Sequence, residues 1–196
     1  WTNGLVGYWS FDGQYTTSTA GTRDVSNSGN WGAFSGGVKP VAGVVGQALS
    51  FDGVDDYIRI EHNSAFNFGT GDFTWEFWLN PSLTGVRLLY KDPNWAAMVP
   101  NGGKFWFRVW QSALDYASLT SSVTPGANTW YHFVALRRGS SLEMYIDGVR
   151  DTAASLSTAG AGVGSNIDST QFISIGSEGG SANFWKGLVD EVRIYN

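Results

Sequence analysis

The sequence contains no cysteine, so its 196 residues can form no disulfide and offer no thiol for catalysis or metal binding. Charged residues are scarce, at 15% of the chain, and the net charge is −5. The 12 lysines and arginines form no basic stripe, which argues against a nucleic-acid partner. No apolar run approaches the ~20 residues that a membrane span requires, so membrane insertion is not expected. No long stretch shows a helical hydrophobic period.

The chain is rich instead in glycine (26) and tryptophan (10), with abundant serine, threonine and valine. These residues suit short strands and tight turns. Low charge combined with serine, threonine and glycine favours an extracellular or cell-surface location. At this length folding buries roughly 70% of the unfolded chain's surface, which is enough for one domain. We therefore expect residues 1–196 to form a single domain of a longer protein, whose other domains are possible partners.

Alternation of apolar and polar residues predicts many short strands. In residues 73–80, Trp75 and Phe77 share the apolar face, whereas Glu76 and Trp78 lie on the other. The predicted strands are 5–11, 48–51, 57–60, 73–80, 87–91, 104–110, 130–137, 142–146, 172–176 and 187–195. Short strands at this spacing predict an all-β fold of two packed antiparallel sheets. The long segments between them, 14–38, 92–103, 113–128 and 153–169, are expected to be loops that carry function or pair as extra strands.

Several of these strands and turns carry recognisable runs: GYWSFDG (7–13), GQALSFDGVDDYI (46–58), FTWEFWLNP (73–81), WYHFVA (130–135), YIDG (145–148) and GLVDEVRIYN (187–196). In this order the runs resemble the laminin G-like jelly-roll family of the concanavalin A-like lectin and glucanase group. Because they extend over the whole chain, the resemblance implies a two-sheet antiparallel jelly-roll β-sandwich. The family mixes carbohydrate-binding modules, adhesion domains and domains of unknown role, so the fold alone does not name a ligand.

Two aspartates far apart in the sequence form the first candidate site. In a regular strand, Asp190 lies on the same side as Val192, so its carboxylate points inward. A buried carboxylate requires a hydrogen bond, an ion partner or a metal. The alternative is that Asp12 and Asp190 only cap turns or accept backbone N–H groups.

The resemblance implies a metal at this place. Many concanavalin A-like domains hold calcium between an N-terminal segment, a glycine-rich turn and a late aspartate. By position this implies Asp12, a backbone carbonyl near Gly46 or Gln47, and Asp190. Hard oxygen ligands of this kind suit calcium, whose role here is expected to be structural.

An aromatic surface forms the second candidate site. In residues 104–110, Trp106, Arg108 and Trp110 alternate on the face opposite the apolar residues, so they are expected to face outward. Flat rings cover the apolar face of a sugar while neighbouring polar groups bind its hydroxyls. The alternatives are that Arg108 stacks between the rings purely for packing or that a loop covers the face.

Four further residues extend this candidate. Trp78, with Glu76 beside it, lies on the polar side of its strand and is predicted to contribute to carbohydrate binding. Trp78 could instead pack beneath a long loop. Trp95 and Trp185 lie in loop-like segments and are predicted rim contacts.

Other ionisable residues receive simpler interpretations. The acidic turn that contains Asp52, Asp55 and Asp56 could bind a metal or sugar hydroxyls, but turns of this type more often bond their own backbone. The same two interpretations apply to Asp24, in the first long loop. His132 is interpreted as a structural histidine with its hydrogen bonds satisfied.

The sequence shows no catalytic pattern. The alternating Glu-x-Asp-x-x-Glu spacing of laminarinase-type relatives does not occur, and neither a Gly-x-Ser-x-Gly elbow nor a His-rich metal motif is found. We therefore predict a non-catalytic, lectin-like module that binds a glycan or polysaccharide. The rival hypothesis is a structural or adhesive domain that binds protein in a surface array or filament.

Overall fold

The computed structural model describes residues 3–17, 20–82, 86–92, 95–99 and 103–196; the side chains of residues 86 and 95–99 lie outside the described part. Within it, eight strands form sheet A: β1 (Leu5–Trp9), β5 (Lys39–Ala42), β6 (Gln47–Asp52), β8 (Phe73–Pro81), β13 (Tyr131–Arg138), β14 (Ser141–Ile146), β15 (Val149–Arg150) and β18 (Lys186–Tyr195). Ten described strands form sheet B: β2 (Thr16–Thr17), β3 (Gly21–Thr22), β4 (Gly32–Ser35), β7 (Tyr57–Ile60), β9 (Val86–Lys91), β10 (Trp95–Val99), β11 (Trp106–Ser112), β12 (Asp115–Thr120), β16 (Ser155–Ala159) and β17 (Ile173–Ile175). Two short 3-10 helices, η1 (Ser64–Phe66) and η2 (Gly162–Gly164), lie in the connections.

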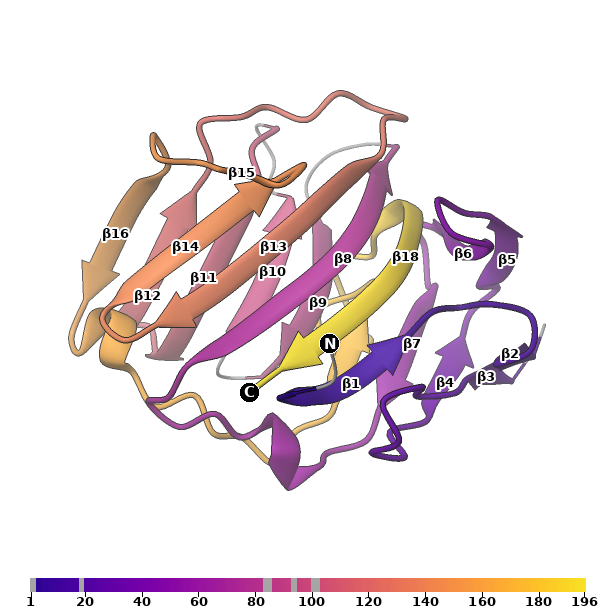
Figure 1. The fold of residues 1–196 in the computed structure, drawn as a ribbon, viewed down its shortest axis with the longest axis horizontal. Helices are drawn as coiled ribbons and strands as arrows, with labels where there is room; N and C mark the ends of the chain where they lie inside the picture. Colours follow the sequence, from indigo (N-terminus) through magenta and orange to yellow (C-terminus); the bar gives the residue numbers. More distant parts are fainter. Residues whose placement is uncertain (1–2, 18–19, 83–85, 93–94, 100–102) are drawn as a thin grey trace.

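The two sheets lie one in front of the other, and every pair of neighbouring strands is antiparallel (Figure 1). Sheet A runs in the order β15-β14-β13-β8-β18-β6-β5, with β1 paired to β18 as well. Sheet B runs β16-β12-β11-β10-β9-β17-β7-β4-β3-β2. Because β1 pairs with β18, residues near the two ends of the chain lie side by side (Figure 1). The predicted fold class is therefore confirmed.

The core lies between the inner faces of the sheets, where the sequence predicted it. Trp75 and Phe77 of β8 are buried, and so are Phe107 and Val109 of β11. The rings of Trp75 and Phe107 meet edge to face, with centroids 5.2 Å apart, so the sheets interlock through aromatic contacts. Glu76, Trp78, Trp106 and Trp110 are only partly buried. The inward-facing and outward-facing residues of β8 and β11 were thus predicted correctly.

The predicted long loops contain further strands, as their length suggested. Strands β2, β3 and β4 occupy part of residues 14–38, β10 lies in 92–103, β12 in 113–128 and β16 in 153–169. Segment 113–128 therefore does not fold over β11, because its strand β12 pairs beside β11. Among the described residues, no helix is long and apolar enough to cross a membrane.

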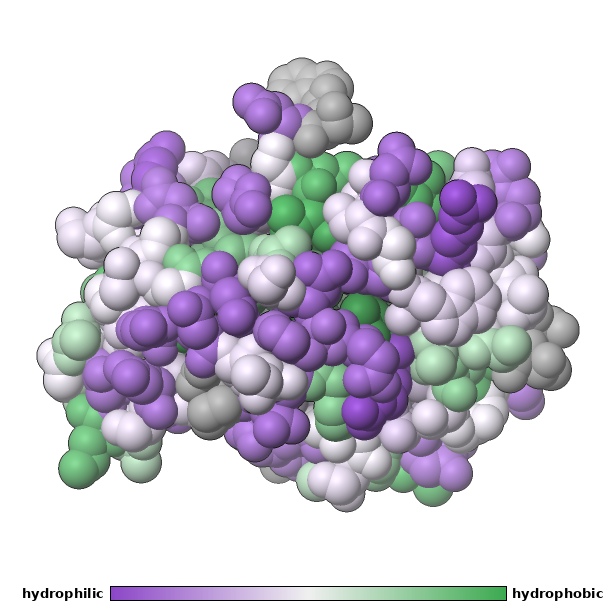
Figure 2. Space-filling model, turned by 90° about the horizontal axis from the view of Figure 1, so that it is seen from below, coloured by the Kyte–Doolittle hydropathy of each residue, from purple (hydrophilic) through white to green (hydrophobic). Residues whose placement is uncertain are grey.

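Polar side chains cover much of the surface in the view from below (Figure 2). Hydrophobic side chains project at the left edge of this view, on the side where Figure 1 places β16. Leu114, before β12, is 82% exposed, and Leu156 of β16 is 52% exposed. Exposed leucines therefore lie at this edge of sheet B.

Candidate functional site

The predicted aromatic surface exists on the outer face of sheet B. Trp106, Arg108 and Trp110 are partly exposed. The residues that alternate with them, Phe105, Phe107 and Val109, are buried. The guanidinium carbon of Arg108 lies 5.8 Å from the Trp106 ring centre and 5.6 Å from that of Trp110. The predicted three-residue row is therefore assembled with its cation between two indoles.

The row is wider than the sequence indicated. Tyr116 of β12 pairs with Trp110, and its ring centre lies 4.3 Å from the Arg108 guanidinium carbon, the shortest of the three ring contacts. On the other side, Tyr90 of β9 contacts Trp110, with ring centroids 5.9 Å apart. We call Tyr90, Trp106, Arg108, Trp110 and Tyr116 the aromatic row. Burial lowers the pKa of Arg108, but a guanidinium remains charged at neutral pH.

Beside Tyr90 the row opens into a hollow of about 420 Å³ between β9, β17 and the loop after β17. Its lining includes Asp92, Gln171, Phe172 and Glu178. The Tyr90 hydroxyl donates to Asp92 Oδ1 at 2.8 Å, and Arg87 forms an ion pair with Glu178 at 2.7 Å. Amide and carboxylate groups therefore lie next to aromatic rings, the combination that sugar hydroxyls and C–H faces require.

The structure separates Trp78 and Glu76 from this row. Both belong to β8 and face outward from sheet A, so they lie on the opposite face of the sandwich from Trp106. Trp78 packs against His132, with ring centroids 4.9 Å apart, and His132 Nε2 bonds to Glu76 Oε1 at 3.1 Å. The candidate residues therefore do not form one surface, because β8 and β11 belong to different sheets.

Trp185 does not extend the row as predicted, and the prediction for Trp95 falls on a side chain outside the described residues. Trp185 is 0% exposed and belongs to the hydrophobic core, so the predicted rim contact is wrong. Its segment has the sequence of a loop, but its backbone N–H donates to Gly176 O at 2.8 Å, which fixes it against sheet B. Trp95 begins β10, opposite Val109, and its side chain lies outside the described residues.

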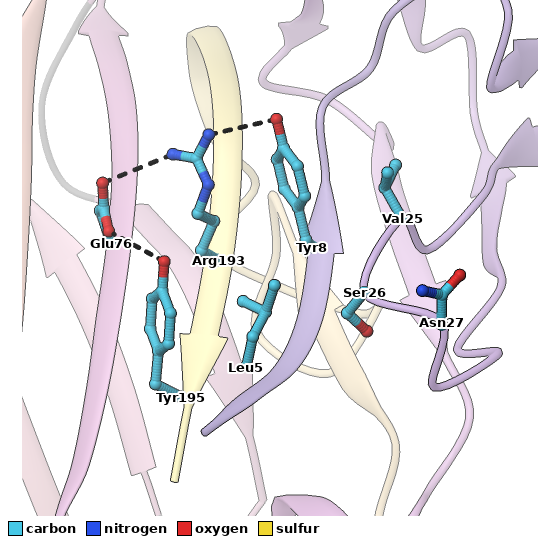
Figure 3. A pocket seen from close by; sticks show the side chains of 8 residues that line it. All are labelled: Leu5, Tyr8, Val25, Ser26, Asn27, Glu76, Arg193 and Tyr195. Atoms are coloured by element: carbon cyan, nitrogen blue, oxygen red, sulfur yellow. Dashed lines mark hydrogen bonds and ion pairs between the residues drawn. The ribbon is translucent and has the colours of Figure 1, made fainter. Parts of the chain in front are cut away.

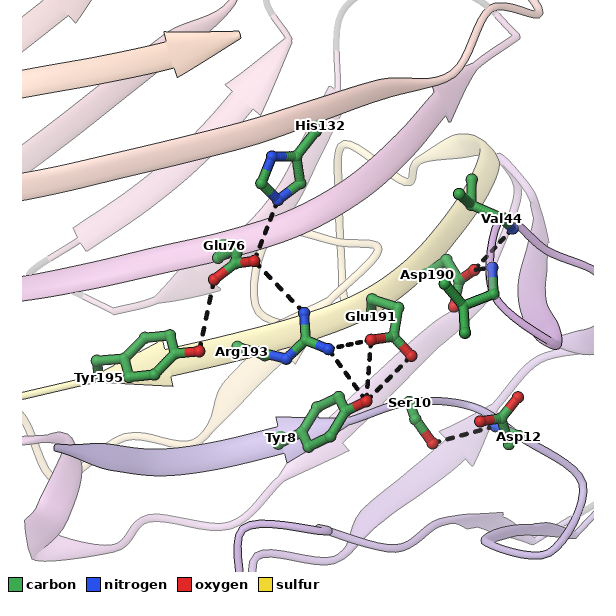
Figure 4. Close-up of polar contacts among 11 residues, drawn as sticks. Tyr8, Ser10, Asp12, Val44, Glu76, His132, Asp190, Glu191, Arg193 and Tyr195 are labelled. Atoms are coloured by element: carbon green, nitrogen blue, oxygen red, sulfur yellow. Dashed lines mark hydrogen bonds and ion pairs between the residues drawn. The ribbon is translucent and has the colours of Figure 1, made fainter. Parts of the chain in front are cut away.

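The turn at residues 43–47, which contains the predicted backbone ligand, bonds to both predicted aspartate ligands, Asp12 and Asp190 (Figure 4). The backbone N–H of Gln47 donates to Asp12 Oδ1 at 3.0 Å. Asp190 Oδ2 accepts from the backbone N–H groups of Val44 and Val45 at 2.9 and 3.1 Å. Both aspartates thus accept backbone N–H groups, as the simpler interpretation expected, and these bonds bring Asp12, the turn and Asp190 together.

Asp190 reaches this turn because β18 is irregular. The prediction that Asp190 shares a side with Val192 is wrong: Asp190 pairs with Trp78, which faces outward. The register shifts between Asp190 and Arg193, and Glu191 has a φ of 55°. This bulge reverses the alternation, so Val192 enters the core while Asp190 stays on the outer face beneath the turn.

The other carboxylate oxygen of Asp190 is an unusual feature. Oδ1 is buried and has no hydrogen-bond partner among the described residues. The residue is 0% exposed, and burial raises the pKa of Asp190 to about 6. An unsatisfied buried carboxylate oxygen is the type of ligand that suits a hard cation. The residues present therefore fit a calcium ion.

The remaining acidic candidates bond to their own backbone. Asp56 Oδ2 accepts from Asp52 N at 2.9 Å, and Asp52 Oδ1 accepts from Val54 N at 2.8 Å. One carboxylate oxygen from each of Asp52, Asp55 and Asp56 lies within 4.8 Å of the other two. Asp24 is 3% exposed and accepts from the backbone N–H groups of Tyr8, Ser26 and Asn30 and from the Asn30 amide, at 2.8–3.0 Å. The structural interpretation of Asp24 is therefore supported.

Comparison with known proteins identifies a family model. Laminin_G_3, described as the concanavalin A-like lectin/glucanases superfamily, matches residues 51–196. No curated protein sequence matches significantly.

Solved structures share the fold. The binding domain of Paraclostridial Mosquitocidal Protein 1 has a TM-score of 0.78 and 18% identity, over 99% of this chain and 49% of that chain. Domain 4 of AbnA, a GH43 extracellular arabinanase from Geobacillus stearothermophilus, in complex with arabinotriose, has a TM-score of 0.72 and 20% identity, over 98% and 92%. Trypanosoma rangeli sialidase, in complex with the inhibitor DANA, has a TM-score of 0.58 and 15% identity, over 97% and 30%. The chain thus spans about half of the mosquitocidal chain. At these identities the likeness shows the jelly-roll fold alone.

Proposed function

The chain belongs to the concanavalin A-like lectin/glucanases superfamily, and from this premise we propose that it is a non-catalytic glycan-binding module. The proposed binding surface is the aromatic row of sheet B together with the adjoining hollow. Binding-domain and arabinotriose-bound neighbours support this class of function. A sialidase also shares the fold, so the absence of catalysis is part of the proposal; release of reducing sugars from a polysaccharide panel tests it.

One observation carries the proposal: two indoles and a guanidinium lie together on an outward sheet face. Trp106 and Trp110 retain exposed surface although large aromatic side chains are normally buried. Arg108 lies between them and is held by Tyr116, so it can donate to sugar hydroxyls without large loss of side-chain entropy. The hollow beside Tyr90 adds acceptors from Asp92 and Glu178.

Calcium is proposed as a structural ion on the other side of the sandwich. Asp12 and Asp190 would hold it, with a backbone carbonyl of the turn near Gln47 as a further ligand. The unpartnered Asp190 Oδ1 supports this assignment. The bound ion would fix the turn against β18 and would not contact the aromatic row.

The module is proposed to act outside the cell or at its surface, joined to other domains of its polypeptide. Low charge and the absence of cysteine are compatible with this setting. One fold neighbour is a domain of an extracellular arabinanase, which supports it further.

The decisive experiment compares glycan-array binding of the wild type with that of Trp106→Ala/Trp110→Ala. The double variant should lose glycan retention while its melting temperature stays nearly unchanged, because both indoles are outside the core. Trp31→Ala is the matched control, since Trp31 is 46% exposed and lies outside the row. Unaltered binding by the double variant would exclude the aromatic row as the site.

A second candidate function is favoured by the apolar edge of sheet B. Strand β16 is the outermost strand and carries no charge, and Leu156 and Leu114 are exposed there. An uncharged edge strand can pair with another chain, so a structural or adhesive domain fits this feature. Concentration-dependent assembly in light scattering without glycan-array hits would favour it; a monomer that binds glycans would favour the first function.

A further inference from the structure

A second hollow, of about 520 Å³, opens on the outer face of sheet A (Figure 3). Leu5 and Tyr8 of β1 and Arg193 and Tyr195 of β18 line it. Glu76 of β8 closes one side. No lining residue belongs to the aromatic row, and the two surfaces lie on opposite faces of the sandwich.

The charged groups of this hollow compensate one another. Arg193 Nη1 donates to Glu76 Oε1 at 3.4 Å, and Arg193 also forms an ion pair with Glu191 (Figure 4). Tyr8 bonds both partners: its hydroxyl donates to Glu191 Oε2 at 2.9 Å and accepts from Arg193 Nη2 at 3.1 Å. Because the guanidinium is already shared between two carboxylates, the hollow offers no free cation to an acidic ligand.

The wall opposite Glu76 is formed by the loop at residues 25–27 and is held rigidly. Asp24 fixes its start through the four hydrogen bonds described above, one of which comes from Tyr8 N at 3.0 Å. Asn27 follows in a left-handed conformation, with φ 72°, and is exposed. Within the described residues, its side-chain amide makes no hydrogen bond, so it is free to bind a ligand at the rim (Figure 3). The hollow is therefore largely preorganised.

We propose that this hollow is a second glycan subsite, which takes a neutral sugar ring. The rings of Tyr8 and Tyr195 and the side chain of Leu5 offer apolar surface to the C–H face of a sugar. Glu76 and Asn27 offer an acceptor and an amide to its hydroxyls. The volume lies in the range of small-ligand sites. A chain with both sites can hold two glycan segments on opposite faces.

The test maps amide chemical shifts by NMR during titration with neutral trisaccharides (arabinotriose, maltotriose and mannotriose), with sialyllactose as the charged comparison. At least one neutral probe should shift the amides of Asn27, Glu76 and Tyr195, and sialyllactose should bind there more weakly. These shifts should persist in Trp106→Ala/Trp110→Ala. In the variant Asn27→Gly/Tyr195→Ala, the affinity obtained from these shifts should fall about tenfold or more, which corresponds to about 1.4 kcal/mol.

The variants keep the result interpretable. Glycine tolerates the φ of Asn27, and Val149→Ala, at a 70% exposed position on the edge of sheet A, is the control whose titration should match the wild type. Failure of every neutral probe to shift these amides, equal or tighter binding of sialyllactose there, or titration unchanged in Asn27→Gly/Tyr195→Ala, would overturn the second subsite. Shifts confined to the aromatic row would reject it and leave the proposed function intact. Shifts confined to this hollow would support the second subsite and reject the aromatic row as the glycan site.

Discussion

Gly46 and Asp12 are in such close contact that any side chain at position 46 would displace the Asp12 carboxylate. A Cβ atom on Gly46 would lie 2.0 Å from Asp12 Oδ1. Gly43 makes the corresponding contact with Asp190, since its Cβ would lie 2.5 Å from Oδ2. The turn therefore fits between the two carboxylates because two side chains are missing. This fit brings the backbone of the turn close enough to donate to both aspartates.

Gly46→Ala should destabilise the fold strongly. The φ of 58° should cost an alanine about 1–2 kcal/mol, and displacement of Asp12 about a further 1–3 kcal/mol. Gly29→Ala is the matched control, because Gly29 has a φ of 74° and no atom lies within 4 Å of its Cβ position. Urea denaturation measures the free energy of unfolding of both variants. Equal losses of this free energy in the two variants would contradict the contact with Asp12.

Calcium should stabilise the protein through the same turn. After a chelator has removed bound calcium, added CaCl₂ should raise the melting temperature. At a hundredfold excess over the Kd, calcium should add about 2.7 kcal/mol to the free energy of unfolding. Asp190→Asn should abolish this response, because an amide is a poor replacement for the buried carboxylate. Asp55→Asn, in the exposed acidic turn, should keep it. The opposite pattern would place the ion at the acidic turn.

Side-chain parity within regular strands was predictable from the sequence. Trp75 and Phe77 enter the core and Trp106 and Trp110 face outward because alternation in a strand is a local property that apolar spacing reports. The same rule failed at Asp190, where the bulge at Glu191 adds a residue that the sequence pattern does not mark. The position of Asp190 is set by its pairing with Trp78 and by the turn above it.

Which strands share a sheet could not be predicted in the same way. Trp78 and Trp106 both alternate as outward residues, yet they lie on opposite faces because β8 and β11 belong to different sheets. Tyr116 joins the row only because β12 pairs with β11, and its segment was predicted as a loop. Trp185 has loop-like neighbours but is buried in the core, and its backbone N–H donates to Gly176 O, nine residues earlier. Each of these positions depends on which strands and turns pair with one another, which alternation within a single strand does not report.

Tyr116→Leu should weaken glycan binding modestly. The Tyr116 ring makes the shortest contact with the Arg108 guanidinium, and an exposed cation–π contact contributes about 0.5–1 kcal/mol. If Tyr116 positions Arg108, affinity measured by calorimetry should fall about two- to fivefold. A loss as large as that of Trp106→Ala/Trp110→Ala would show instead that Tyr116 contacts the glycan directly.

The stability of the protein in acid should depend on Glu76. The pKa of Glu76 lies below its usual value, mainly because of the hydrogen bond with His132. The charge of Arg193 lowers this pKa further. A carboxyl whose folded pKa is lowered contributes stability above its unfolded pKa of about 4.3, and this contribution is lost as pH falls through the folded pKa. Unfolding free energy should therefore decline with acidification below about pH 4.3.

Glu76→Gln should flatten this decline, because glutamine does not titrate but still accepts from His132. Glu61→Gln is the matched control: Glu61 also has a lowered pKa, through Arg59, but its side chain is 74% exposed and its ion pair contributes little. Urea denaturation across acidic pH should thus show a shallower slope for Glu76→Gln and a slope close to the wild type for Glu61→Gln. Parallel slopes in all three proteins would mean that the network around Glu76 is not coupled to folding, and that the acid sensitivity originates elsewhere.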